Sequence, residues 1–302
     1  MVAALIIAAG KTARENSFQP LAEVGTIPAI QRIVMVFQRA GIERIVVICD
    51  DHDSKIEAPT AHMNLVYLPG CKDAEMFDNV KVGLAYLSDK CAAAMITHVG
   101  VPLFSVETVH ALISAEGAVR TPSHHGKAGH PMLLSSENFS AILSYSGDGG
   151  LAGAVKTLGL QRKFIEVTDE GVLTNLHDGE SYEHLLPGHS LMKLHPDIRI
   201  RVAREKPFYG PGSHLLLRLT DETGSLREAC RHMGISYTKG RALILRIEQQ
   251  LGYPVIESRQ GGKAGGNSVV TEQGKELIQN YTKFLEEVKD CINELFSRYF
   301  TS

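Results

Sequence analysis

The pattern of apolar and polar residues divides the chain into two parts. Residues 3–7 form a continuous apolar run, which is typical of a strand buried on both faces of a sheet. Further apolar runs alternate with helical periodicities, and these predict strands at 44–49, 65–68 and 93–97 and helices at 29–40, 76–87 and 106–115. This alternation predicts an α/β domain with a mainly parallel, Rossmann-like layered sheet.

The pattern changes after the turn-rich residues 187–196. Residues 198–203 alternate apolar and basic side chains, as in a half-exposed strand, and helices are expected at 213–220 and 226–233. Ser225 is placed to cap the helix at 226–233. After the Gly234 turn, Ser236 is placed to cap a second helix that ends at Gly252. The apolar stripe expected on this second helix comprises Ala242, Ile244 or Leu245, Ile247 or Glu248, and Leu251. Two short helices around a glycine turn predict a helix-turn-helix.

Two strands and a long helix complete the C-terminal part. Residues 253–259 and 268–271 are predicted to pair as a wing around the glycine-rich turn 260–267, which alone could also be taken for a nucleotide loop. The final helix, 272–296, carries apolar residues at alternating spacings of four and three: Leu277, Tyr281, Phe284, Val288, Cys291 and Leu295. This spacing predicts a coiled-coil seam and a homodimer; the alternative is a helix packed on its own domain.

Charge and cysteine content refine this picture. The net charge of −3 is unevenly distributed, because residues 193–302 contain 17 basic and 13 acidic residues. A small basic excess suits a nucleic acid partner, although ordinary surface variation gives the same balance. The five cysteines form no CxxC pair, which suits reduced thiols and a cytoplasmic location. No apolar run is long enough to span a membrane, and residues 1–7 are expected to form a strand rather than a signal peptide.

Four motifs occur in order in the N-terminal part: AAGKTAR at 8–14, VGTIP at 24–28, GKAGHP at 126–131 and GDGG at 147–150. Together they resemble the MobA-like nucleotidyltransferases, especially the branch that joins a nucleotide to molybdopterin. Residues 172–185 are similar to the closing stretch of that family. The resemblance implies nucleotide binding by Ala8, Ala9, Gly10, Arg14, Gly129, His130 and Asp148.

The chain departs from this family at the residues that carry its chemistry. Gln19 stands where the family has a lysine, and Gly100 stands where it has a Mg²⁺-binding aspartate. Asn175 and His177 occupy the closing DxD positions. Because nucleotidyl transfer depends on a metal and on cations, we predict a degenerate domain that retains its pocket without the reaction. We therefore assign no catalytic residue and predict no metal site.

Alternatives to this interpretation remain open. Each departure could reflect an alignment slip of one or two residues. Asp50, Asp51 and Asp53 follow a strand, which would allow them to serve as replacement metal ligands. The histidines His98, His124, His125, His130 and His177 offer a different metal site, although no clear ligand pair occurs on one element.

The C-terminal part is similar to the DNA-binding domain of ModE, the molybdate-responsive repressor, and to the LysR-type winged helix. The similarity rests on TGSL at 223–226, GISY at 234–237, LGYP at 251–254 and GGKAGG at 261–266. Gly240 and Arg241 stand where the family usually has Ala-Trp. The resemblance and the position of the second helix imply DNA binding by Ser236, Tyr237, Thr238, Lys239, Arg241 and Lys263.

The sequence therefore predicts a nucleotidyltransferase-type domain at 1–186, a linker at 187–196 and a winged helix with a C-terminal dimerisation helix at 197–302. The functional hypothesis is a transcription regulator of molybdenum or molybdopterin metabolism. Its expected partners are a near-palindromic DNA operator, a second copy of the chain and a nucleotide or pterin ligand. One alternative is an active molybdenum cofactor cytidylyltransferase that uses CTP and Mg²⁺ and carries a DNA-binding domain. Another is a structural fusion whose first domain only recruits a partner.

Overall fold

The computed structural model describes residues 1–10, 19–49, 54–70, 73–176, 182–259 and 267–300. The chain forms two compact units, Met1–Lys193 and Leu194–Ser302. The boundary falls within the predicted linker 187–196, so residues 187–193 belong to the first unit. Each unit is described separately.

The first unit is built on one mixed sheet with the strand order β10-β7-β9-β6-β1-β4-β5, and β8 pairs with β7. The strands are β1 (Val2–Ile7), β4 (Arg44–Cys49), β5 (Val66–Pro69), β6 (Ala93–His98), β7 (Val119–His124), β8 (Lys127–Ala128), β9 (Met132–Ser135) and β10 (Arg162–Glu166), beside a small hairpin of β2 (Glu23–Val24) and β3 (Ile27–Pro28). Neighbouring strands pair in parallel except for β9, which is antiparallel to β6 and β7, and β8, which is antiparallel to β7.

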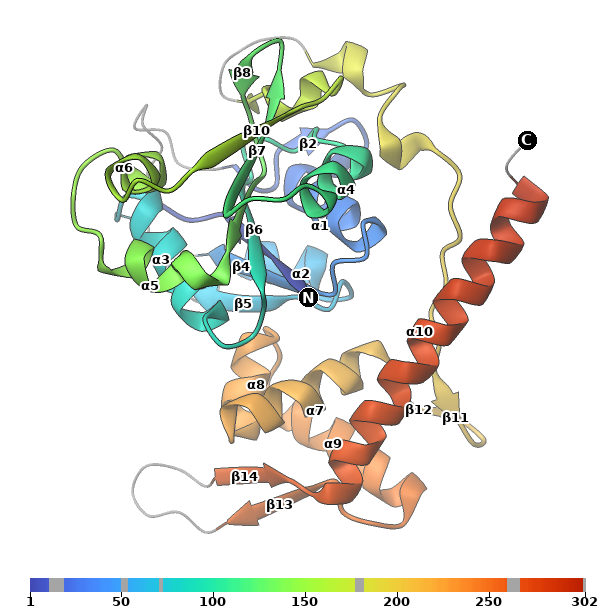
Figure 1. Ribbon diagram of the computed structural model, residues 1–302. Coiled ribbons are helices and arrows are strands. Elements are labelled where there is room, and N and C mark those ends of the chain that lie inside the picture. The colour runs from blue at the N-terminus through green and yellow to red at the C-terminus, as the bar shows by residue number, and fades with distance from the viewer. Residues whose placement is uncertain (11–18, 50–53, 71–72, 177–181, 260–266, 301–302) are drawn as a thin grey trace. The chain divides into compact units, whose positions relative to one another are not determined.

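Helices cover both faces of this sheet (Figure 1). They are α1 (Ala29–Arg39), α2 (Ser54–Thr60), α3 (Met76–Leu87), α4 (Val106–Ser114), α5 (Phe139–Ser144) and α6 (Gly150–Thr157), with short 3-10 turns at Ser136–Asn138, Glu170–Val172, Glu183–Leu185 and Ser190–Met192. Residues 3–7 of β1 are at most 1% exposed, as the continuous apolar run predicted. The predicted layered α/β fold of this part is confirmed.

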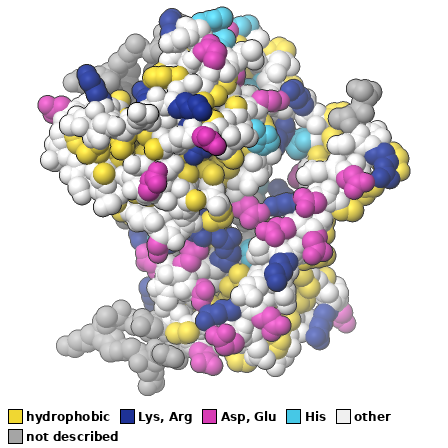
Figure 2. Space-filling view, in the orientation of Figure 1, with side chains coloured by type: hydrophobic (Ala, Val, Ile, Leu, Met, Phe, Trp, Pro, Cys, Tyr) yellow, Lys and Arg dark blue, Asp and Glu magenta, His cyan; other side chains and the backbone are white. Residues whose placement is uncertain are grey.

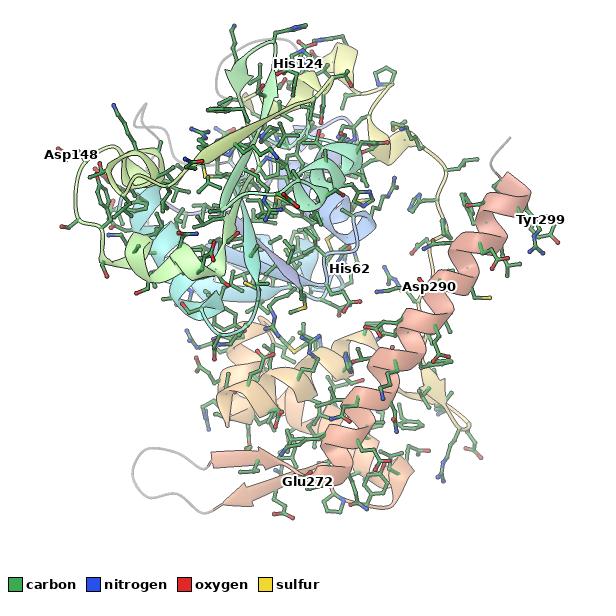
Figure 3. The ribbon with its side chains drawn as sticks, viewed as in Figure 1. His62, His124, Asp148, Glu272, Asp290 and Tyr299 are labelled. Carbon is green, nitrogen blue, oxygen red and sulfur yellow. The ribbon has the colours of Figure 1, made fainter. Side chains whose placement is uncertain are left out.

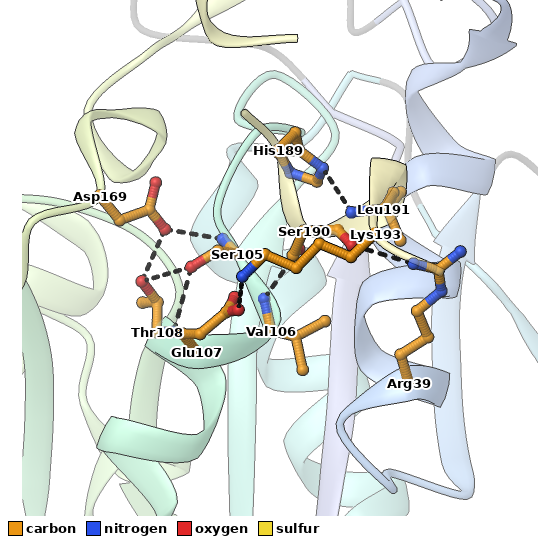
Figure 4. A network of polar contacts seen from close by, with 10 residues as sticks. All are labelled: Arg39, Ser105, Val106, Glu107, Thr108, Asp169, His189, Ser190, Leu191 and Lys193. Atoms are coloured by element: carbon orange, nitrogen blue, oxygen red, sulfur yellow. Dashed lines mark hydrogen bonds and ion pairs between the residues drawn. The ribbon is translucent and has the colours of Figure 1, made fainter. Parts of the chain in front are cut away.

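Residues 189–193 pack onto the first unit through a network of polar contacts (Figure 4). The Oγ of Ser190 accepts a hydrogen bond from the backbone N–H of Val106 at 3.2 Å. The backbone carbonyl of Ser190 accepts a second hydrogen bond from the Arg39 side chain at 3.0 Å. His189 contacts the carbonyl oxygen of Phe104 at 3.2 Å, and Lys193 pairs with Glu107. These contacts explain why the first unit continues past residue 186.

The second unit contains a helical core, a two-stranded wing and a long C-terminal helix. Its elements are β11 (Val202–Ala203), β12 (Pro207–Tyr209), α7 (Pro211–Thr223), α8 (Leu226–His232), α9 (Tyr237–Leu251), β13 (Ile256–Arg259), β14 (Asn267–Val270) and α10 (Glu272–Phe300). The caps predicted for α8 and α9 are present: Ser225 accepts from the N–H of Glu228 at 3.3 Å, and Ser236 accepts from that of Lys239 at 3.2 Å.

The structure corrects three expectations for this unit. The predicted strand 198–203 contains only β11 at its end, since its partner β12 is three residues long. Helix α7 is longer than the predicted 213–220, and it begins at Pro211. A proline is tolerated in the first turn of a helix, because the N–H that it lacks would have no partner within the helix there. The predicted inner stripe of α9 is wrong at Ala242, which is exposed, and of the alternatives Ile244 and Leu245 it is Ile244 that is buried. The buried residues of α9 are Gly240, Ile244 and Ile247.

The apolar seam predicted along α10 is buried in one part and exposed in another. Tyr281 is only 3% exposed and packs within its own unit, with its ring 5.0 Å from that of Tyr209 and 4.9 Å from that of His214. Its hydroxyl donates a hydrogen bond to the carbonyl of Ile200 at 2.7 Å. Phe284, by contrast, is 48% exposed. The seam therefore serves the unit's own core at Tyr281, and only its later residues lie outside that core.

No helix in the described ranges is both long enough and apolar enough to cross a lipid bilayer.

Candidate functional site

The first strand ends in a tight turn at the predicted nucleotide loop. Ala8 and Ala9 are 7% and 4% exposed, and Gly10 has a φ of +102°, which favours glycine. A Cβ atom on Gly10 would lie 2.7 Å from Nδ2 of Asn79. The backbone here thus packs against the start of α3 with no room for a side chain on Gly10.

Asn79 is a residue of this region that the sequence analysis missed. It is 1% exposed, and its amide donates a hydrogen bond to the carbonyl of Ala9 at 3.0 Å. A Cβ atom on Gly70, at the end of β5, would lie 2.9 Å from the Asn79 Oδ1. Asn79 therefore connects the turns after β1 and β5. Its only sequence signal is a polar residue on the apolar side of the helix 76–87.

Gly100 lies where the family resemblance placed a metal-binding aspartate. A Cβ atom there would lie 2.9 Å from the His98 Nδ1 and 3.0 Å from the Asn175 Oδ1. The backbone N–H of Gly100 donates to His98 Nδ1 at 3.2 Å, and its carbonyl accepts from the N–H of Leu176 at 2.9 Å. An imidazole and an amide thus fill the space around this position.

His130 extends this cluster, with its ring 4.7 Å from that of His98 in an edge-to-face arrangement. The residue is partly exposed, but its Nδ1 is buried and has no hydrogen-bond partner among the described residues. Burial, aided by the charge of Arg162, lowers the pKa of His130 to about 4, against a hydrogen bond to the backbone of Ile96 that raises it. The ring is therefore neutral at pH 7 and presents an unused acceptor. From the sequence, His98 and His130 were grouped only as alternative metal ligands, and Asn175 was not placed with them.

The remaining predicted residues of the first unit are placed separately. Gly129 contacts the closing stretch closely, since a Cβ atom there would lie 2.4 Å from the carbonyl oxygen of Val172. Asp148 is exposed and lies apart from His124 (Figure 3). Its loop reaches the start of α3, where a Cβ on Gly150 would lie 3.7 Å from that of Phe77. Gln19 is exposed.

Some predicted residues lie outside the described ranges. They are Arg14 and Lys263 of the predicted binding residues, His177 of the closing stretch, and the alternative ligands Asp50, Asp51 and Asp53. Within the described ranges, no group of three or more His, Cys, Asp or Glu side chains is arranged to hold a metal ion.

In the second unit, the predicted DNA-binding residues share one exposed surface at the start of α9. Tyr237 is 39% exposed, with the Arg227 guanidinium 5.0 Å above its ring. Ser236, Thr238, Lys239 and Arg241 are exposed as well. On the face of the molecule seen in Figure 2, acidic and basic side chains are interspersed over this unit, so a uniform charge does not mark a binding surface there. The start of α9 differs locally, because residues 236–247 include basic and no acidic side chains.

The first unit matches a known family. The model of the MobA-like NTP transferase domain matches residues 4–163. Among solved structures, a nucleotidyl transferase from Methanothermobacter aligns with a TM-score of 0.52 at 15% identity, covering 63% of this chain and 99% of that one. At this identity the likeness concerns the fold alone.

The C-terminal part is homologous to molybdenum-related proteins. The molybdenum-pterin-binding protein MopB of Rhodobacter capsulatus is 38% identical over 66 residues, which are 22% of this chain and 24% of that protein. The DNA-binding transcriptional dual regulator ModE of Escherichia coli is 33% identical over 78 residues, 26% of this chain and 30% of that protein. The chain thus spans less than a third of either relative.

Proposed function

The chain belongs to the family of MobA-like NTP transferase domains through its residues 4–163, joined to a ModE-like domain, and from this premise we propose that it is a DNA-binding transcription regulator of molybdenum or molybdopterin metabolism. The ModE-like domain binds DNA, and the transferase-like unit acts as its sensor. The observation that carries this proposal is the exposed start of α9, whose residues 236–247 have no acidic side chain. Phosphate backbones attract such a surface, and helix-turn-helix proteins read bases with it.

In this proposal the first unit has exchanged catalysis for ligand binding. Mg²⁺ takes oxygen ligands in octahedral geometry. The described groups around Gly100 are the His98 imidazole and the Asn175 amide, which offer no carboxylate to such an ion. Gln19 also lacks the cationic charge that would stabilise a transferring phosphoryl group. We therefore expect no nucleotidyl transfer, because the loss of these charges costs several powers of ten in rate.

The proposed ligand is a nucleotide or a pterin. The turn at Ala8–Gly10 and its support by Asn79 favour a group that approaches the main chain closely. The unused acceptor on His130 favours a ligand with an N–H or O–H donor. Both features would contact the ligand through uncharged groups of the protein and not through a metal ion. We therefore expect binding that depends little on Mg²⁺.

We also propose that the chain acts as a homodimer on a near-palindromic operator. The later part of α10 exposes large apolar side chains, with Leu295 at 42% and Tyr299 at 72%. Tyr299 lies at the far end of the helix from Glu272 (Figure 3). A second copy would cover these residues, and a twofold dimer places two recognition helices about one turn of DNA apart.

The test begins with the full chain and DNA. A near-palindromic duplex selected from a random pool should be bound with an affinity that falls steeply as salt rises. Replacement of Lys239 and Arg241 by alanine should weaken binding to the selected duplex more than to unrelated DNA. Absent or salt-independent DNA binding would refute the proposal.

The sensor part is tested by titration with CTP, GTP and ATP, with and without Mg²⁺. We expect detectable binding and no transfer to molybdopterin. The variant Gln19→Lys with Gly100→Asp should gain weak Mg²⁺ binding if the His98 and Asn175 side chains move aside for it. Robust Mg²⁺-dependent pyrophosphate release by the unaltered protein would instead identify an active cytidylyltransferase with a DNA-binding domain.

A further inference from the structure

The rotation of α9 about its axis is fixed by close packing on its inner side. A Cβ atom on Gly240 would lie 2.2 Å from the Sγ of Cys230 in α8, so α9 approaches α8 closely at this glycine. Ile244 and Ile247 are 5% and 0% exposed on the same side. Three inward residues at spacings of four and three define the opposite face of the helix.

That opposite face carries a stripe of four exposed residues at i, i+3, i+4 and i+7, namely Thr238, Arg241, Ala242 and Leu245. Leu245 is 42% exposed although it is a large aliphatic residue. Leu245 and Arg241 also line a hollow of about 180 Å³, together with Leu226, Tyr237, Ile244, Glu248, Ile256 and Ser268. The stripe thus combines one cation with three methyl-bearing side chains.

The stripe contains no carboxylate. The nearest acidic residue along α9 is Glu248, and its carboxylate accepts hydrogen bonds from the backbone N–H groups of Val255 at 2.9 Å and Ile256 at 3.3 Å. Glu248 therefore holds the start of the wing. A carboxylate is the side chain that accepts from the amino group of cytosine, whereas arginine donates to O6 and N7 of guanine and apolar groups contact the C5-methyl of thymine.

We propose that this stripe reads a guanine through Arg241 and the C5-methyl groups of neighbouring thymines through Ala242 and Leu245, so that these two apolar residues determine sequence specificity. The inference rests on the proposed DNA binding and deepens it by naming the bases. An exposed leucine contributes little to the stability of the free protein. When the helix lies in the major groove, contact between Leu245 and a thymine methyl removes both groups from water and so favours binding.

The test compares thymine with uracil, which differs only by the C5-methyl. The full chain selects a duplex from a random pool, and each thymine of that duplex is then replaced by deoxyuridine. At one or more positions beside a guanine, the change should weaken binding about four-fold, as expected when the burial of one methyl group is lost. Leu245→Ala should weaken binding to the thymine duplex by a similar factor and should no longer distinguish thymine from uracil at one such position.

The matched control is Leu158→Ala, since Leu158 is 37% exposed but belongs to the first unit. It should leave affinity and discrimination unchanged, and thermal melting should show that both variants are folded. If the selected duplex is bound equally with thymine and uracil, or if Leu245→Ala still discriminates at every position where the unaltered protein does, the base assignment is wrong while DNA binding stands. If no duplex is selected at all, both the assignment and the proposed function are wrong.

Discussion

The two units use their buried polar groups in different ways. In the first unit, the Nε and Nη1 of Arg32 and the Nδ1 of His130 are buried without a hydrogen-bond partner among the described residues. In the second unit, the buried Tyr209 hydroxyl lies 3.0 Å from Nδ1 of His214. Unsatisfied buried groups cost stability, so their presence in a stable fold calls for another role. In the first unit, the Nδ1 of His130 thus lies beside the candidate site, whereas in the second unit Tyr209, His214 and Tyr281 join β12, α7 and α10.

The largest expected effect comes from the aromatic cluster of the second unit. Tyr281→Asp places a carboxylate between the rings of Tyr209 and His214 and should destabilise this unit by about 4 kcal/mol or more. We expect loss of its cooperative unfolding transition, measured by circular dichroism during a denaturant titration.

The matched variant is Phe284→Asp, one turn further along the same helix and 48% exposed. It should leave the unit folded, and in sedimentation it should weaken self-association if α10 forms the dimer. Equal stability of the two variants would show that Tyr281 is not part of this core.

This pair of residues also shows how far sequence patterns extend. Alternating spacings of four and three correctly indicated an apolar face on α10, but they carry no information on what covers it, because burial depends on distant residues such as Tyr209. The core strand β1 was predictable, since a strand buried on both faces needs no knowledge of its neighbours.

The candidate site of the first unit was predictable in part. Motif comparison identified Gly100 as a departure, yet the close approach of His98 and Asn175 arises from the folding back of residues 170–176. Asn79 belongs to no motif, and its role depends on the spatial meeting of the turns after β1 and β5. Contacts between segments distant in sequence are what residue patterns leave out.

The next effect concerns acid stability of the first unit. The pKa of His130 is lowered to about 4 in the folded state, against about 6.5 when unfolded. Because the folded pKa is depressed, the neutral ring stabilises the fold fully above pH 6.5, and this contribution is lost as the pH falls towards 4. The loss amounts to about 3 kcal/mol, since one pKa unit equals 1.36 kcal/mol.

Urea unfolding at pH 7, 5 and 4 measures this effect, with His130→Asn as the comparison. The variant should lose less stability between pH 7 and 4 than the unaltered protein. His189, whose pKa is also lowered by burial, remains in both and contributes equally. Parallel pH profiles of the two proteins would contradict the buried, neutral state of His130.

A smaller effect of opposite sign is expected at Arg32. Its Nη2 donates to the carbonyl of Val24 at 2.8 Å, but burial lowers the pKa of its guanidinium, and its Nε and Nη1 have no partner among the residues that the structure describes. Arg32→Met keeps an unbranched apolar stem and removes a poorly compensated buried charge, so the free energy of unfolding should rise by about 1 kcal/mol. Arg39→Met serves as control, because Arg39 bonds the Ser190 carbonyl, and it should lower stability. Destabilisation by Arg32→Met would indicate that other groups of the fold compensate the buried charge of the Arg32 guanidinium.

The smallest effect tests whether burial, rather than charge, holds residues 189–193 on the first unit. The Lys193 and Glu107 side chains are 65% and 58% exposed, so water and salt screen their attraction. Lys193→Ala should therefore change the free energy of unfolding by less than about 0.5 kcal/mol. Ser190 is 6% exposed, and Ser190→Ala leaves the Val106 N–H without its acceptor, which should cost about 1 kcal/mol. Denaturant titrations at low and high salt separate the two, because only the Lys193 effect should shrink with added salt. A larger and salt-sensitive cost at Lys193 would mean that an exposed ion pair anchors this segment, against the buried contacts that Figure 4 shows.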